Sequence, residues 1–378
     1  MPGLPEAAGV SLDGVVALES AICDLGAEDG RLRYRGYDAA ELAAHSTFEE
    51  TAFLLLRGEL PNRAELRDFE GEIKEAQKLT PVTLRSFKSM PGNADPMLAL
   101  RVAMAVSAAE MPVAVPPSPA DAWRQGIRLI AQTPTMVAAF HRLRRSERPV
   151  APRKGLRFAA NFLQMLSGTA PEAEATRAFD TALILRAENE LNPSTFAARV
   201  AAATGADVYA AVAAATAALG GPRHGWHSCN VMRMLEEVGT PEAAAGWVRL
   251  QIQSGKKIPG FGHQVYQGED PRTALLRPLV EAQSERVGMR QLFRTARAVE
   301  EAVRRDTGQH AIVDFYLAPL YRAVGIPTDL FTVIFAVSRM PGWVAHTREQ
   351  YQDDRLIRPR AQYRGAPHRF YAPMRGRS

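Results

Sequence analysis

The chain has 378 residues, of which 46% are hydrophobic and 23% are charged, so it can bury a full hydrophobic core. This length exceeds the usual size of a single domain. We therefore expect two cooperating domains. The two cysteines, Cys23 and Cys229, exclude a disulfide framework and favour a reducing cytoplasm over secretion. The N-terminus lacks the pattern of a signal peptide, and the alanine-rich stretch 208–219 is shorter than the roughly 20 residues of a membrane-spanning helix. We expect a soluble cytoplasmic protein with no membrane partner.

The net charge of +5 is unevenly distributed. Seven arginines and no acidic residue lie between Arg355 and Ser378, so residues 1–354 carry a net charge of about −2. A second basic cluster lies between Arg142 and Arg157. Such clusters are usually solvated faces, so no nucleic-acid partner is expected. Anionic small substrates explain the arginines at least as well.

The first half of the chain carries mostly helical signals. An alternating pattern over 31–37 predicts a small hairpin, and no sheet of four or more strands is indicated. Ser46 to Glu49 resembles a capping box that starts a helix ending near Gly58. Asn62 is expected to cap a second helix that runs through Lys78.

A proline-rich segment, 111–119, is predicted to be a surface loop inside the first domain. After it, the stretch 133–145 has a proline near its expected first turn and arginines at its end, the order that the helix dipole favours. Further helices are predicted at 157–166, 173–189, 194–203, 207–219, 241–253, 289–304 and 329–350.

Three separated polar residues are the candidates for chemistry: His224 in GPRHGW, His263 in PGFGHQVY and Asp314 in VDFY. Two imidazoles and a carboxylate suit enolate chemistry, because a base must remove a proton while a donor stabilises the oxyanion that forms. Each residue also has a plain structural alternative: a satisfied structural histidine at 224, a turn histidine at 263, and a buried ion pair at 314. Metal binding is not predicted, because the histidines and cysteines show no regular ligand spacing.

These motifs resemble those of the citrate synthase family, including its 2-methylcitrate-forming members. LRYRGYDAAELA, FEETAFLLLRGELP, NPSTFAARVAAATGADVYAAV and GWVAHTREQ extend the resemblance over most of the chain. The resemblance implies an all-α fold with a large domain (1–221 and 328–378) and a small domain (222–327) that close over oxaloacetate and then an acyl-CoA. It also implies a homodimer, or a higher oligomer, and no cofactor other than the coenzyme A thioester as substrate.

The resemblance assigns roles to particular residues. His224 donates to the thioester oxygen, Asp314 removes the methyl proton, and His263 donates to the keto oxygen of oxaloacetate. Carboxylates are held by guanidinium groups, and the last of these reaches the neighbouring subunit's site. The carboxylate-binding residues are Arg272, Arg339 and Arg358, with Asn189 beside them, and the candidate coenzyme A residues are Lys257, Ile258, Gly260, Phe261, Gly262 and Gln267.

Several positions depart from the family's pattern. LILRAENELN places Arg186 and Asn189 where the family has two histidines, and losing the charge-assisted bond at 189 is expected to weaken binding by roughly 1.5 to 3 kcal/mol. Further departures are Gly225-Trp226-His227-Ser228-Cys229, Gln264, Gln267 and Leu317. Two interpretations follow: a condensing enzyme, forming citrate, 2-methylcitrate or a related product, and a weakened or non-catalytic relative that binds a carboxylate or coenzyme A. Within the first, His227 is a candidate for the imidazole missing at 189.

Overall fold

The computed structural model describes residues 15–26, 30–262, 266, 268–371 and 373–376. Over these residues the chain forms sixteen α-helices and one three-stranded sheet of two-residue strands, so the all-α prediction is confirmed. The helices are α1 Ala39–His45, α2 Phe48–Arg57, α3 Arg63–Ala76, α4 Pro81–Lys88, α5 Pro96–Ala109, α6 Pro119–Arg144, α7 Phe158–Ser167, α8 Ala173–Leu185, α9 Pro193–Ala202, α10 Val208–Leu219, α11 His227–Val238, α12 Pro241–Gln253, α13 Pro271–Arg286, α14 Arg290–Thr307, α15 Val313–Ala323 and α16 Phe331–Asp353, with short 3-10 turns at Thr328–Leu330 and Met374–Gly376.

The small sheet lies near the N-terminus and confirms the predicted hairpin. Strand β2 (Arg33–Tyr34) pairs antiparallel with β3 (Tyr37–Asp38) on one side and with β1 (Cys23–Asp24) on the other. The buried Tyr34 hydroxyl donates to the carbonyls of Ile184 and Glu188, both 3.1 Å away. The sheet therefore holds the C-terminal end of α8 in place.

Two helix starts differ from the sequence prediction. The N-cap of α2 is Thr47, whose hydroxyl accepts from the Glu50 amide, whereas Ser46 ends α1. Asn62 caps α3 as predicted, in a full capping box with Glu65. Helix α6 begins at Pro119 and contains Pro134 in its interior, so the start predicted at 133 is wrong. An interior proline disfavours a helix by about 3 kcal/mol, and the continuous burial of the residues around Pro134 outweighs that penalty.

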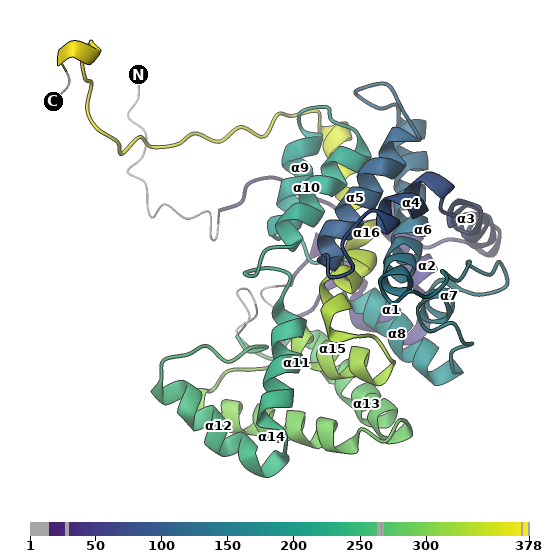
Figure 1. Cartoon of the computed structure of the whole chain (residues 1–378), viewed down its shortest axis with the longest axis vertical. Helices are drawn as coiled ribbons and strands as arrows, with labels where there is room; N and C mark the ends of the chain where they lie inside the picture. Colours follow the sequence, from purple (N-terminus) through teal and green to yellow (C-terminus); the bar gives the residue numbers. More distant parts are fainter. Residues whose placement is uncertain (1–14, 27–29, 263–265, 267, 372, 377–378) are drawn as a thin grey trace.

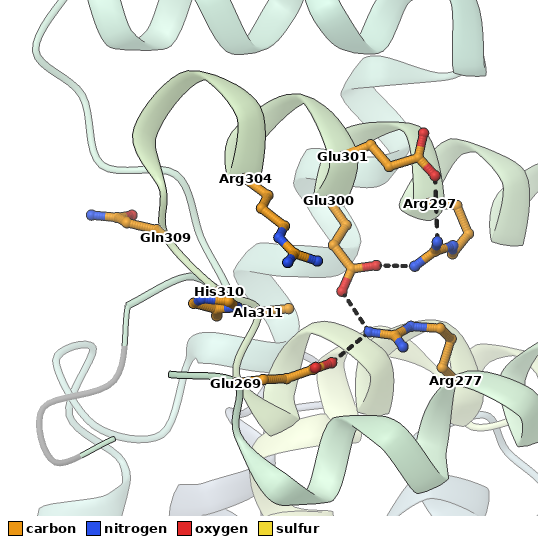
Figure 2. Close-up of a pocket in the computed structure, with 9 residues that line it drawn as sticks. All are labelled: Glu269, Arg277, Arg297, Glu300, Glu301, Arg304, Gln309, His310 and Ala311. Carbon is orange, nitrogen blue, oxygen red and sulfur yellow. Dashed lines mark hydrogen bonds and ion pairs between the residues drawn. The ribbon is translucent and has the colours of Figure 1, made fainter. Parts of the chain in front are cut away.

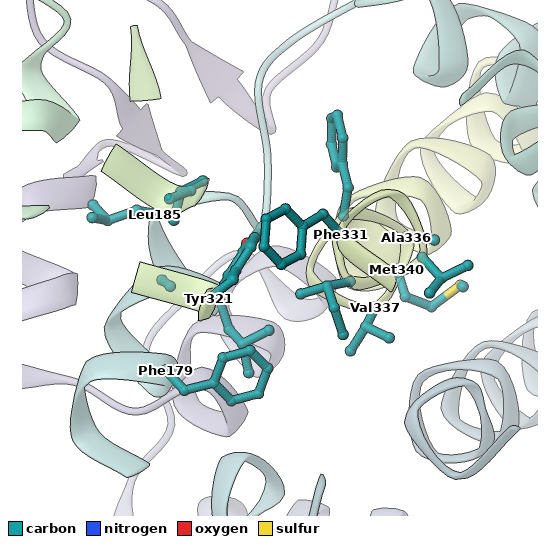
Figure 3. Close-up of a cluster of buried hydrophobic side chains, with 14 of the residues drawn as sticks. Phe179, Leu185, Tyr321, Phe331, Ala336, Val337 and Met340 are labelled. Atoms are coloured by element: carbon teal, nitrogen blue, oxygen red, sulfur yellow. The ribbon is translucent and has the colours of Figure 1, made fainter. Parts of the chain in front are cut away.

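Helix α16 is the centre of the larger group of helices in Figure 1 and packs against α2, α6, α9 and α10. Phe331 of α16 packs against Tyr321, which contacts Phe179, and Val337 and Met340 of α16 belong to the same apolar cluster (Figure 3). Each of these side chains is almost completely buried, and burial of one such side chain stabilises the fold by about 1.5–3 kcal/mol. The same helix carries Phe335 and Arg339, so its burial fixes the backbone of the candidate site.

Helices α11 to α15 form a second group, drawn in green below the first in Figure 1. Helix α15 packs on α11 and α13 within this group and on α8 from the larger one. The boundaries predicted for the small domain, 222–327, enclose these helices and remain a prediction. Beyond α16, residues 355–371 follow an irregular path away from the helices (Figure 1), with Tyr363 and Phe370 exposed. No helix in the described part of the chain has the length and apolarity that crossing a bilayer requires.

Candidate active site

Asp314 lies in the first turn of α15 and is 6% exposed. Its Oδ1 accepts a hydrogen bond of 2.7 Å from Arg186 Nη2 and one of 2.5 Å from Ser228 Oγ. Arg186 directly follows α8, and Ser228 is in the first turn of α11, so three helices bring these groups together. The ion pair that the sequence left open as an alternative for Asp314 is present.

Asp314 is ionised despite its burial. Burial alone raises the pKa of a carboxyl group, but the Arg186 guanidinium, His227 and the Ser228 hydroxyl together lower the pKa of Asp314 to about 2. The carboxylate therefore carries its charge at neutral pH.

Three polar side chains surround the ring of Phe335 on α16, and we call them the Phe335 cluster: Arg186, Arg339 and His224. The guanidinium carbons of Arg186 and Arg339 lie 3.8 and 4.9 Å from the ring centroid. The His224 ring meets Phe335 edge-on with a centroid separation of 5.7 Å. Through Arg186, the cluster connects directly to Asp314.

His224 lies in the loop between α10 and α11, where its amide bonds to the Gly221 carbonyl. Its Nε2 is 2.8 Å from Ser194 Oγ, and the Ser194 hydroxyl also reaches Asn192 Oδ1 at 2.7 Å. Burial, followed by the charges of Arg339 and Arg186, lowers the pKa of His224 to about 4, so the imidazole is neutral at neutral pH. The role of Ser194 was not foreseen from the sequence; the signal was its place beside the helix cap Asn192.

The titration of His224 predicts a pH dependence of stability. Its pKa is near 6.5 when unfolded and about 4 when folded, so the unfolded chain binds the extra proton as the pH falls through this range. We expect the free energy of unfolding to decrease between these pH values by up to about 3 kcal/mol on account of this residue. Denaturant unfolding of the wild type and of His224→Gln across the range measures it. Parallel curves for the two proteins would refute the assignment.

Arg339 is a buried guanidinium with one donor left unused by the described residues, and the buried carboxylate of Glu188 interacts with it electrostatically. Arg339 is 2% exposed, and its Nε donates to the Arg186 carbonyl at 2.9 Å. Its Nη1 is buried and has no hydrogen-bond partner among the described residues. Burial lowers the pKa of Arg339, and an unpaired buried donor is costly unless a ligand satisfies it.

Arg272 and Asn189, predicted to share a site, are in contact. Arg272 Nη1 donates to Asn189 Oδ1 at 3.2 Å, while its Nε and Nη2 hold the Asp270 carboxylate at 2.8 and 2.7 Å. Asp270 also accepts from the backbone amide of Val313, which precedes Asp314. Among the described contacts of Asn189 none is with His227, which instead contributes to lowering the pKa of Asp314.

The loop proposed for coenzyme A lies against the residues that lead into α15. The Gly262 amide donates to the His310 carbonyl, and the Ile312 amide donates to the Gly260 carbonyl. Lys257 is exposed before this loop, and Ile258 and Phe261 are half-buried. His263, Gln264 and Gln267 lie outside the described residues.

Gly260 is required where it stands. Its φ is +86°, and a Cβ there would lie 2.7 Å from Val231 Cγ2 and 2.9 Å from Phe315 Cδ2. We expect Gly260→Ala to lower the free energy of unfolding by roughly 2–5 kcal/mol, from backbone strain plus overpacking. Gly308→Ala is the matched control, because Gly308 has φ +72° but open space around it, and should cost only about 1 kcal/mol. Equal losses in denaturant unfolding would show that the Gly260 contacts are unimportant.

A cavity between α13, α14 and the segment 309–311 contains none of the predicted catalytic residues (Figure 2). Its arginines face an equal number of glutamates: Arg277 bonds to Glu269 and Glu300, and Arg297 bonds to Glu300 and Glu301. Because the charges balance, the cavity offers no clear anion site, and the Phe335 cluster is the better candidate.

Comparison with known proteins agrees with this geometry. The family model described as citrate synthase, C-terminal domain, matches residues 11–360. The chain belongs to the citrate synthase family. Citrate synthase 2 of Bacillus subtilis is 40% identical over 97% of this chain and 98% of its own length, and 2-methylcitrate synthase of Mycobacterium tuberculosis is 40% identical over 94% and 90%. The ternary complex of Thermoplasma acidophilum citrate synthase with carboxymethyl coenzyme A and oxaloacetate superposes with a TM-score of 0.91, at 28% identity and 97% and 98% coverage.

Membership of the citrate synthase family makes the contacts of Asp314 distinctive. Arg186 and Ser228, which the resemblance marks as departures from the family's motifs, both bond to the same carboxylate oxygen. The sequence located the changes but not their contact with each other. Arg358 is exposed in the segment beyond α16.

Proposed function

We propose that the protein condenses an acyl-CoA with oxaloacetate and hydrolyses the resulting thioester, releasing citrate and coenzyme A when the acyl group is acetyl. The observation that carries this proposal is the buried, ionised Asp314 joined through Arg186 to the Phe335 cluster, which contains the neutral His224. A base and a neutral donor in one buried site are what enolisation of a thioester requires.

In the first step, Asp314 takes a proton from the carbon next to the thioester carbonyl, and His224 donates a hydrogen bond to the carbonyl oxygen as negative charge develops there. A neutral imidazole donates from one nitrogen only. If Nδ1 is that nitrogen, Nε2 must accept, and the Ser194 hydroxyl must donate to it. The Ser194 hydroxyl would then turn away from Asn192 Oδ1. That oxygen would still accept from the backbone amides of Ser194 and Thr195, so it would keep hydrogen-bond donors.

In the second step, the enol carbon attacks the keto carbon of oxaloacetate and forms the new carbon–carbon bond. His263 is proposed to donate to the keto oxygen, and Arg272, Arg339 and Asn189 to hold the carboxylates. The unpaired Nη1 of Arg339 supports this assignment. Water then cleaves the thioester, and the coenzyme A thiol leaves.

The partners and location follow from the same proposal. The coenzyme A portion is assigned to Lys257, Ile258, Gly260, Phe261, Gly262 and Gln267, with no cofactor or metal. A homodimer is proposed because Arg358 lies on an exposed segment that can reach a neighbouring site. A cytoplasmic location fits the two free thiols, Cys23 and Cys229.

Release of free coenzyme A thiol tests the function. Acetyl-CoA and propionyl-CoA are each supplied with oxaloacetate and, separately, with other 2-keto acids. We expect release with oxaloacetate, and the ratio of kcat/KM for the two thioesters separates citrate from 2-methylcitrate formation, a difference worth only about 1–3 kcal/mol. No release with any pair would favour the non-catalytic relative, for which the Arg186–Asp314 ion pair is the specific observation.

A further inference from the structure

Two substituted residues from distant parts of the chain converge on one atom. Arg186 is 128 residues from Asp314 and Ser228 is 86 residues from it, yet both donate to Oδ1. Arg186 Nη1 also bonds to Ser228 Oγ at 3.2 Å, which closes a three-membered network. All three side chains are buried: Arg186 is 3% exposed, Ser228 2% and Asp314 6%.

The network fixes one oxygen of the Asp314 carboxylate and leaves the other oxygen without a donor from the described residues. Among the described residues, no donor reaches Oδ2 of Asp314. Arg186 cannot swing into water, because its guanidinium is buried and stacked on Phe335 at 3.8 Å. One carboxylate oxygen is therefore held by two donors, and the other remains able to accept a proton.

We propose that Arg186 and Ser228 position the base: they fix Oδ1 of Asp314 so that Oδ2 is the oxygen that removes the substrate proton. This inference rests on the proposed function. Arg186 and Ser228 then act together on Asp314. The guanidinium of Arg186 stabilises the negative charge, and the Ser228 hydroxyl fixes the orientation of the carboxylate.

Charged and titratable groups from every neighbouring element enter this balance. From α11, His227 lowers the pKa of Asp314, and from the end of α8 Arg186 lowers it more. From α15 itself, Tyr321 lies close enough for its own pKa to respond to Asp314 and Arg186. From α13, the Asp270–Arg272 pair is linked to this region through the bond from the Val313 amide to Asp270. From the loop before α11, His224 interacts with Asp314 and with Arg186, so loss of the guanidinium raises the pKa of His224 as well. Ser228→Ala leaves Arg186 in place and therefore isolates the effect on Asp314.

The test is the pH profile of coenzyme A release by the full-length protein with Arg186→Met, Arg186→Lys and Ser228→Ala. Without the Arg186 guanidinium, nothing of comparable size offsets the effect of burial, which raises the pKa of Asp314. We expect the acid limb of kcat/KM to move up by about one pH unit or more in Arg186→Met and less in Ser228→Ala, with partial restoration in Arg186→Lys. The KM for oxaloacetate should change by less than about threefold, since Arg272, Arg339 and Asn189 are intact.

Arg128→Met is the matched control, because Arg128 forms a partly buried pair with Glu110 at 3.1 Å outside the site. Its acid limb should stay at the wild-type position. Turnover in Arg186→Met or Ser228→Ala with a wild-type acid limb would overturn the inference while leaving the proposed function standing. If Arg186→Met does not fold, the acid limbs of Ser228→Ala and Arg186→Lys provide the same test. Absence of turnover in every chain, wild type included, would overturn the function and the inference with it.

Discussion

Asp314→Asn is expected to lower kcat by about 10³-fold, because the amide cannot accept the substrate proton and general-base catalysis typically contributes 10²–10⁴. The side-chain shape is retained, and the amide oxygen can still accept from Arg186 and Ser228. The KM values should change little, since the asparagine removes an interaction made in the transition state. Steady-state kinetics of coenzyme A release, with circular dichroism to verify folding, measures the effect.

Asp180→Asn serves as the control for this substitution. Asp180 is also a buried aspartate, but burial and the nearby Glu49 raise its pKa to about 7, and it accepts from the Phe48 amide away from the Phe335 cluster. Turnover should remain at the wild-type level there. If Asp314→Asn retained comparable turnover, another group would have to be the base.

The second large effect is expected at Arg339. Arg339→Gln should raise the KM for oxaloacetate about 100-fold, because a buried charge-assisted contact with a carboxylate is worth several kcal/mol. The Tm of the free protein should change little, because loss of the Nε bond to the Arg186 carbonyl and of the interaction with buried Glu188 is offset by removal of a buried cation whose Nη1 has no partner in the described structure. The rise in Tm that oxaloacetate produces in the wild type should disappear.

These two measurements separate a binding residue from a structural one. A structural arginine would lower the Tm of the free protein when replaced and would leave the oxaloacetate-induced shift in place. Arg128→Gln, away from the site, should keep both the KM and the shift at wild-type values. A normal KM in Arg339→Gln would mean that the buried guanidinium serves the fold alone.

Local signals in the sequence were sufficient for many elements. Asn62 capped α3 as predicted, and the range predicted for the helix 241–253 is that of α12. Helix α15 was not predicted, although it carries Asp314. It contains Pro319 in its interior, and an interior proline argues against a helix when only local signals are used. Helix α6 was truncated in the prediction for the related reason that tertiary burial overrode Pro134.

The sequence by itself determined the chemistry available to this protein: two histidines, one aspartate and a set of arginines in motifs of the citrate synthase family. The resemblance to these motifs also singled out Arg186 and Ser228 as expected departures from the family's pattern. Only the tertiary structure decided that these two residues meet at one oxygen of Asp314. Helix ends that are distant in sequence become neighbours through core packing, and a buried charge interacts strongly with whatever that packing places beside it. The structure therefore gives Arg186 a contact with the base, where the sequence had indicated only a lost histidine.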